Sequence, residues 1–145
     1  MVKILHTRTW KKEKAVTLVE TIVSLSIILI VSIAAVSVSI YSANAFRLSN
    51  VKRFFNHEIN TIAEMYVTYN DADKFYQAVG VHTGKAVINN GAYVDTIYYL
   101  NNSMSYLDDS NGSNFYISLA FDGNTLNLSS YSNSGTELAK RSVTR

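Results

Sequence analysis

The longest uncharged run in the chain, Thr21 to Phe46, decides what kind of fold is possible. Its 26 residues contain no charged side chain, no glycine and no proline. A helix needs about 20 apolar residues to cross a bilayer core, whereas the apolar core of a signal peptide has only about 7–15. The run therefore predicts a membrane-spanning helix rather than a signal peptide.

Glu20 lies inside the apolar segment, four residues after the segment starts at Val16. A charged side chain in lipid costs a few kcal/mol on insertion scales and is usually paired and functional. Alternatively, Glu20 lies at the membrane interface, where the dipole of the helix favours an anion near its first turn. The physical chemistry of this residue leaves both interpretations open.

The residues around Glu20 resemble the processing site of type IV prepilins and pseudopilins. A basic leader is followed by a small residue, an apolar residue, threonine, leucine, any residue and glutamate, here Lys14-Ala15 and then Val16-Thr17-Leu18-Val19-Glu20. In that family a membrane peptidase cuts before the apolar residue and methylates the new amino terminus. The resemblance implies cleavage between Ala15 and Val16, methylation of Val16, and Glu20 as the fifth residue of the mature chain. Ala15 replaces the family's usual glycine, and Val16 its usual phenylalanine or methionine.

The same resemblance implies how the chain assembles. Glu20 would pair with the positive amino terminus that cleavage creates on a neighbouring subunit, and with Thr17 it would set the register of a filament. The implied partners are prepilin peptidase, other pilin or pseudopilin subunits, a platform protein, an assembly ATPase and the lipid bilayer. The absence of cysteine, and of proline between Val16 and Asn70, favours a minor pilin or a pseudopilin over a main pilin.

Charge is distributed unevenly along the chain. Residues 1–15 contain five of the 13 basic side chains and one of the 11 acidic ones. The positive-inside rule then places the amino terminus in the cytoplasm and the C-terminal part outside the membrane. Because the rest of the chain has more acidic than basic side chains, nucleic acid is not an expected direct ligand. Without cysteine, the exported part has to be stabilised by its core alone.

Beyond Tyr41, apolar residues recur at steps of three and four, which is typical of a helix with one buried face. The recurring residues are Leu48, Val51, Phe55, Ile59, Ile62, Met65 or Tyr66, and Tyr69. Because neither glycine nor proline occurs before Asn70, we expect one helix of about 55 residues from Val16, or roughly 80 Å. Two helices hinged near Asn44 are the alternative.

A cluster of turn-forming residues, Asn70 to Asp73, is expected to end this helix. Asp71 or Asp73 then caps a short second helix that runs through Val79 and ends at Gly80. Two aspartates this close can also hold a cation. No further carboxylates follow in register, so capping is the preferred interpretation.

From Val81 onward the apolar period changes to two, which predicts β-strands. Strands are expected at Ala86–Ile88, Ala92–Leu100, Phe115–Phe121, around Leu126 and Leu128, and at Thr136–Ala139. Turns are expected at Asn90-Gly91, 108–114, Asp122-Gly123 and 132–135. The fold class is α+β: a long N-terminal helix packed on a small antiparallel β-sheet. The expected domains are a leader at 1–15, a membrane-spanning half-helix at 16–43, an amphipathic half-helix at 44–70 and a globular β domain at 71–145.

The sequence offers no group of residues for catalysis. It has no nucleophile elbow, phosphate loop, metal-binding helix or pair of catalytic carboxylates, so we expect neither an enzyme nor a cofactor. The loop at 108–114 resembles an oxygen-ligand calcium loop, but its glycine is misplaced and a solvated turn is preferred. The ten tyrosines suit a half-polar sheet surface, where cross-strand packing is preferred over ligand binding.

Two functions fit these observations. The first is a minor pilin or pseudopilin, a structural subunit of a type IV pilus-like, secretion or competence filament that starts in the cell membrane. The alternative is an uncleaved single-pass protein that displays the sheet domain as an extracellular binding module. This alternative explains the span and the domain but leaves Thr17 and Glu20 without a role.

Overall fold

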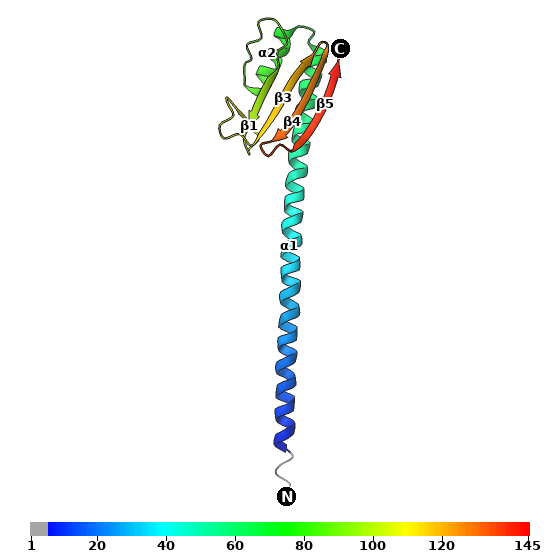
Figure 1. Ribbon diagram of the computed structural model, residues 1–145, viewed down its shortest axis with the longest axis vertical. Helices are drawn as coiled ribbons and strands as arrows, with labels where there is room; N and C mark the ends of the chain where they lie inside the picture. The colour runs from blue at the N-terminus through cyan, green and yellow to red at the C-terminus, as the bar shows by residue number, and fades with distance from the viewer. Residues whose placement is uncertain (1–5) are drawn as a thin grey trace. The chain divides into compact units, whose positions relative to one another are not determined.

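The computed structural model describes the backbone of residues 6–145 and the side chains of residues 17–145. Two helices, α1 (His6–Thr68) and α2 (Ala72–Thr83), precede five strands (Figure 1): β1 (Thr96–Leu100), β2 (Tyr106–Leu107), β3 (Phe115–Asp122), β4 (Thr125–Ser132) and β5 (Glu137–Thr144). The fold class is α+β, as the sequence predicts. The chain divides into two units, residues 1–47 and residues 48–145.

Helix α1 spans 63 residues. It continues through Asn44, so the alternative of two helices hinged there is wrong. It also begins earlier than the expected start at Val16. The reason is that residues 6–15 contain no glycine or proline, the two residues that most strongly interrupt a helical hydrogen-bond ladder.

Serine and threonine side chains in the apolar part of α1 bond within the helix. Five hydroxyls donate to the main-chain carbonyl oxygen four residues earlier, over 2.7–2.9 Å: those of Thr21, Ser26, Ser32, Ser37 and Ser39. An unpaired hydroxyl in an apolar environment costs free energy. These bonds therefore make the side chains compatible with lipid or with a packed helix bundle.

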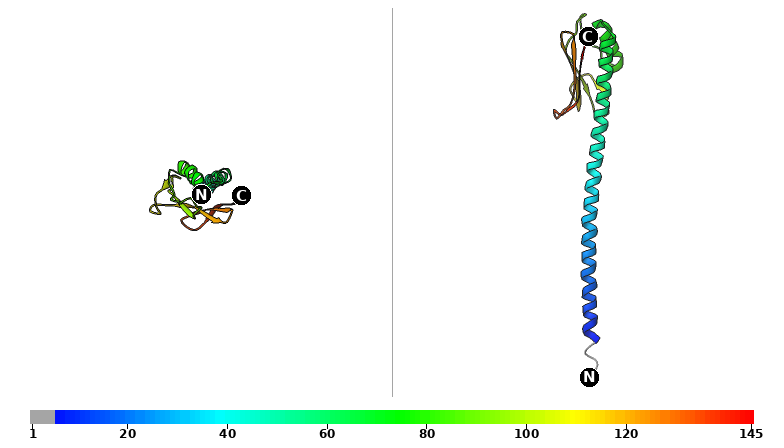
Figure 2. Two further views of the ribbon diagram at one scale, coloured as in Figure 1. Left: turned by 90° about the horizontal axis from the view of Figure 1, so that it is seen from above. Right: turned by 90° about the vertical axis from the view of Figure 1, so that its right-hand side faces the viewer.

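Within residues 48–145, the C-terminal part of α1 buries most of its predicted apolar stripe. Phe55, Ile59, Ile62 and Tyr66 each expose 1% of their surface or less. They recur every three or four residues and so share one helix face. Figure 2 shows the sheet along one side of this part of α1, with α2 beside it, so both helices cover the same face of the sheet.

The sheet has the strand order β2-β1-β3-β4-β5, and every neighbouring pair is antiparallel. Its inner face is built from fully buried side chains: Leu100, Ile117, Leu119, Leu126 and Leu128. Burying a side chain of this size contributes about 1.5–3 kcal/mol relative to leaving it exposed. The alternation predicted over 115–121 is confirmed, since Tyr116 and Ser118 are only half-buried between these core positions.

The N-terminal edge of the sheet differs from the prediction. Residues 86–88 are irregular, and β1 is paired instead by β2, which the sequence analysis missed. β1 also begins at Thr96 rather than Ala92. The cause is visible at Val94, whose carbonyl oxygen accepts from the Tyr76 hydroxyl at 2.7 Å and whose N–H donates to the same hydroxyl at 3.0 Å. The main chain there bonds to a side chain of α2, not to a strand.

The last strand is longer than predicted. β5 runs on past Ala139 and pairs with β4 as far as Thr144, opposite Thr125. The charged residues Lys140 and Arg141 follow the predicted end at Ala139, but an edge strand tolerates charged side chains on its solvent side. The sequence pattern therefore indicates solvent exposure at these two residues, and strand pairing continues regardless.

Helix α2 begins with the predicted cap. Asp71 Oδ1 accepts from the N–H groups of Asp73 at 2.9 Å and Lys74 at 3.2 Å. The predicted end at Gly80 is wrong: the helix continues to Thr83 and is followed by Gly84 with φ +70°. Gly80 has a different role, because a Cβ at this position would lie 3.3 Å from the carbonyl oxygen of Lys85 where the chain returns past the helix.

Arg145 closes the C-terminal end of α1. The last turn of this helix contains no basic residue of its own. The Arg145 guanidinium donates from Nε to the carbonyl oxygen of Tyr66 at 2.7 Å and from Nη2 to the carbonyl oxygens of Tyr66 and Tyr69. It also lies 3.7 Å from the centroid of the Tyr66 ring and donates to the Tyr93 hydroxyl at 2.6 Å. A residue beyond β5 thus supplies the cation that the helix end favours.

We predict that Arg145→Ala lowers the melting temperature of residues 48–145 by about 4–8 °C, the shift that accompanies ~1 kcal/mol in a domain of this size. Arg145→Lys is the control, because lysine keeps the charge but loses the planar fork, and it should recover only part of the loss. Thermal unfolding of the full chain in detergent, followed by near-ultraviolet circular dichroism, measures this. Equal melting temperatures for wild type and Arg145→Ala would contradict the capping role.

Candidate functional site

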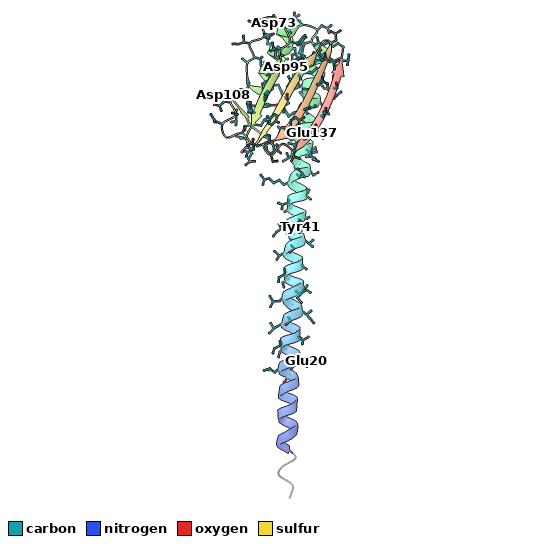
Figure 3. All side chains as sticks on the ribbon, viewed as in Figure 1. Glu20, Tyr41, Asp73, Asp95, Asp108 and Glu137 are labelled. Atoms are coloured by element: carbon teal, nitrogen blue, oxygen red, sulfur yellow. The ribbon has the colours of Figure 1, made fainter. Side chains whose placement is uncertain are left out.

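The predicted processing and assembly residues lie in the first turns of the apolar part of α1. Thr17 and Glu20 are three residues apart and so lie on neighbouring positions of one helix face. Ala15 and Val16 belong to α1, but their side chains lie outside the described residues. Glu20 is exposed (Figure 3), and none of the described side chains pairs with it.

The apolar surface of α1 before residue 47 is uncovered by the rest of the described chain. Every large apolar side chain from Leu18 to Phe46 exposes more than half of its surface. The helix is long and apolar enough to cross a membrane, and none of its most apolar window is buried within the chain. This much exposed apolar surface requires a cover of lipid or of other protein chains.

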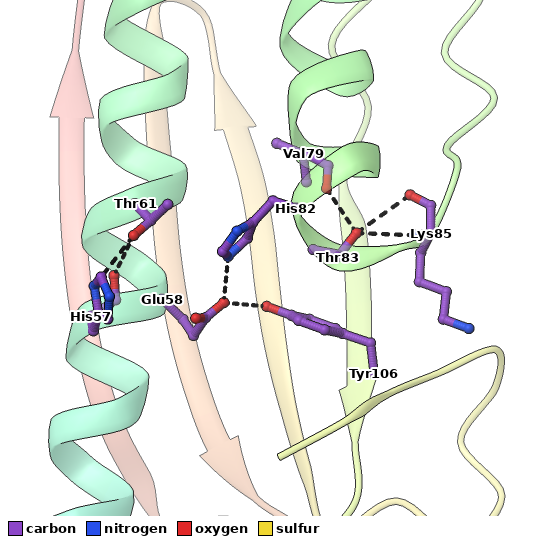
Figure 4. A network of polar contacts seen from close by, with 8 residues as sticks. All are labelled: His57, Glu58, Thr61, Val79, His82, Thr83, Lys85 and Tyr106. Atoms are coloured by element: carbon purple, nitrogen blue, oxygen red, sulfur yellow. Dashed lines mark hydrogen bonds and ion pairs between the residues drawn. The ribbon is translucent and has the colours of Figure 1, made fainter.

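A second polar group that sequence reasoning missed lies inside residues 48–145. Glu58 on α1 is buried, and its Oε2 accepts from the Tyr106 hydroxyl at 2.6 Å. His82 Nε2 lies 2.8 Å from the same oxygen (Figure 4). One carboxylate thus ties together α1, the last turn of α2 and β2. The signal in the sequence is that Glu58 stands three residues after Phe55 and four before Ile62, on the apolar stripe itself.

Burial sets the electrostatics of this group. The pKa of Tyr106 is raised, first by burial and then by its hydrogen bond to Glu58 and the charge of that carboxylate. The phenol therefore stays protonated and remains a donor to Glu58. Burial also raises the pKa of Tyr98, whose ring meets the Tyr106 ring edge to face at 6.0 Å. The Tyr98 hydroxyl is buried and, among the described residues, has no hydrogen-bond partner.

The 108–114 loop directs its carboxylates at protein groups. Asp108 pairs with Lys85 at 2.5 Å. Asp109 accepts from the main-chain N–H of Asn111 at 2.9 Å and from its side-chain amide at 3.1 Å. Across the described residues, no three His, Cys, Asp or Glu side chains gather as metal ligands would. The two aspartates thus organise the loop and its contact with Lys85.

The tyrosines on the outer face of the sheet pack against each other. Tyr116 on β3 stands opposite Tyr131 on β4, with ring centroids 5.3 Å apart and planes 28° apart. Tyr99 on β1 stands opposite Tyr116 on its other side. This row is the cross-strand packing expected from the sequence.

We predict that Tyr106→Phe destabilises residues 48–145 by about 1–3 kcal/mol, because the buried Glu58 loses one of its donors. Tyr98→Phe is the matched control: it also removes one buried tyrosine hydroxyl, but one that has no partner, so it should be neutral or stabilising. The free energy of unfolding of both full-length variants, measured in the same detergent, compares them. If the two substitutions cost the same, the hydrogen bond to Glu58 contributes nothing.

Comparison with known proteins identifies the amino-terminal part of the chain. A family model described as the prokaryotic N-terminal methylation motif matches residues 10–36. No curated protein matches the chain, and no solved structure does. The matched residues include Lys11, Lys12 and Lys14 of the basic leader, the residues Val16 to Glu20 and the first part of the apolar run. At residues 10–36 the chain therefore carries the prepilin-type signal of the type IV pilin family.

Proposed function

We propose that this protein is a minor pilin or pseudopilin, a structural subunit of a membrane-derived filament. The observation that carries the proposal is the uncovered apolar surface of α1, which begins within the prepilin-type signal at residues 10–36 and continues beyond it. Lipid covers that surface before assembly, and the helices of other subunits cover it afterwards. Residues 48–145, called the head from here on, bury a hydrophobic core of their own. The head therefore does not need the membrane to cover its core.

Processing begins at the leader. Prepilin peptidase cuts between Ala15 and Val16 and methylates the new amino group of Val16. The leader, residues 1–15, contains five basic side chains and stays on the cytoplasmic side. Residues 16–43 then form the membrane-spanning and assembly half of the helix, residues 44–70 its amphipathic half, and residues 71–145 the globular domain outside the membrane.

Glu20 sets the axial register of the filament. Because the hydroxyls of Thr21, Ser26 and their neighbours bond within α1, they need no partner in a packed bundle. Glu20 has no such internal solution among the described residues, and an unpaired carboxylate in an apolar bundle is costly. The ammonium group that cleavage creates at Val16 of a neighbouring subunit satisfies it, with Thr17 on the same face. A buried charge pair of this kind fixes register even where it adds little net stability.

The remaining machinery follows from this role. A platform protein in the membrane and an assembly ATPase lift the subunit from the bilayer into the growing filament. Pilus-like, secretion and competence filaments all fit the subunit described here.

The amino-terminal residue of the native protein tests the processing step. We predict that protein extracted from membranes begins at Val16 and is methylated there, because the peptidase recognises the signal at residues 10–36. Mass spectrometry of the intact chain measures this directly. A chain that still begins at Met1 would falsify the proposal and favour an uncleaved, membrane-anchored binding module.

The role of Glu20 is tested by Glu20→Ala. We predict normal membrane insertion and cleavage but loss of the subunit from sheared filaments, because the neighbour's ammonium group no longer has its partner. Glu64→Ala is the matched control, since it removes an exposed carboxylate from the same helix within the head and should assemble normally. Quantitative immunoblots of membrane and filament fractions compare the variants. Wild-type incorporation of Glu20→Ala would exclude the register role.

A further inference from the structure

The turn at Asn90-Gly91 has the features of a chemical modification site. Both residues are exposed, and both have positive φ angles, +49° and +77°. Apart from Gly91 itself and its two chain neighbours, no atom of the described residues lies within 4 Å of the place where a side chain on Gly91 would begin. Neither the Asn90 side-chain amide nor the Gly91 amide nitrogen has a hydrogen-bond partner among the described residues. An asparagine amide and the amide nitrogen of an unhindered glycine thus stand next to each other without competing contacts.

We propose that Asn90 is a site of spontaneous deamidation through a cyclic imide with Gly91. Base removes the proton from the Gly91 amide, and that nitrogen attacks Cγ of Asn90. The new N–Cγ bond forms, the departing Nδ2 group takes a proton from the protonated base, and the Cγ–Nδ2 bond breaks to release ammonia. Water then opens the ring: cleavage at Cγ gives aspartate, and cleavage at the main-chain carbonyl carbon gives isoaspartate. No oxidant, reductant or enzyme is required.

Asn111-Gly112 provides a comparison within the same chain. Asn111 has the same exposed neighbour, Gly112, but its side-chain amide donates to Asp109 Oδ2 at 3.1 Å and its main-chain N–H donates to Oδ1 at 2.9 Å. The attack requires the side chain to rotate away from Asp109. Breaking about one net hydrogen bond raises the barrier enough to slow the reaction at Asn111 roughly tenfold relative to Asn90.

The position of the turn gives the modification a structural effect. Asn89 donates from its side chain to Asp73 at the start of α2, and its carbonyl oxygen accepts from Ala92 N–H at 2.9 Å. Isoaspartate at position 90 adds one carbon to the main chain within that turn and adds a negative charge beside it. The next residues include Tyr93, whose hydroxyl accepts a hydrogen bond from Arg145, and Val94, whose carbonyl oxygen accepts one from the Tyr76 hydroxyl. The modified turn therefore loosens the contacts that this segment makes with α2 and with Arg145, which binds the end of α1.

The test uses the full chain in detergent, incubated in mildly alkaline and mildly acidic buffer. Site-resolved mass spectrometry quantifies aspartate and isoaspartate at positions 90 and 111. We expect conversion at Asn90 about ten times faster than at Asn111, faster in the alkaline buffer, and with isoaspartate among the products. Aspartate alone at position 90, which indicates direct hydrolysis, or faster conversion at Asn111, overturns the proposal.

Two variants separate the chemistry from general exposure. Asn90→Gln keeps an amide at the site but requires a larger ring, so modification at position 90 should be lost. Asp109→Ala frees Asn111 without touching the 89–92 turn, so the rate at Asn111 should rise towards that at Asn90. An unchanged rate at Asn111 in Asp109→Ala shows that hydrogen bonding does not set the difference and contradicts the mechanism.

Discussion

The structure depends on how the apolar surface of one long helix is covered. Between Phe55 and Tyr66 the chain covers it itself: the stripe on α1 is buried completely under the sheet and against α2. Before residue 47 the chain offers no cover among its described residues. The free energy gained by hydrophobic burial is roughly proportional to the apolar area removed from water. Burial of the first region therefore stabilises residues 48–145. The second region gains the free energy of burial only when lipid or other protein chains cover it.

Within residues 48–145, hydrophobic packing alone does not fix the position of α1 on the sheet, so directional polar contacts are needed as well. Packing of Ile59 or Ile62 against leucines of the sheet is non-directional, and a helix can slide on such a surface. The polar contacts at the edges of the core fix it. Arg145 binds the carbonyl oxygens at the end of α1, Tyr76 binds Val94, and Glu58 joins α1 to α2 and β2. Each uses a side chain to bond an element that is distant in sequence.

The sequence predicts those parts of the fold that rest on periodicity. The stripe on α1, the alternation over Phe115–Phe121 and the cap at Asp71 all follow from local patterns, and the structure confirms them. The errors occur where contacts with residues distant in the sequence determine the local structure. Residues 86–88 have strand-like composition but no strand beside them, and β1 starts late because Tyr76 reaches the main chain of Val94. α2 passes Gly80 because Val79 and Thr83, four residues apart on one helix face, are both buried, and glycine lowers helix propensity without forbidding a helix.

Two glutamates on α1 show why one site was predicted and the other was not. Glu20 lies in a run without other charges, and its oddity is visible in the sequence alone. Glu58 lies among Arg53, His57 and Glu64, where a carboxylate attracts no notice until the helix face is drawn. In the structure the two glutamates differ in burial and in hydrogen bonding. Glu58 is buried and satisfied by Tyr106 and His82, so it needs nothing from another molecule. Glu20 belongs to a surface that must be covered, and its carboxylate has no partner among the described residues. Of the two, only Glu20 lacks a partner within the part of the chain whose side chains the structure describes, and for that reason the proposed assembly is assigned to it.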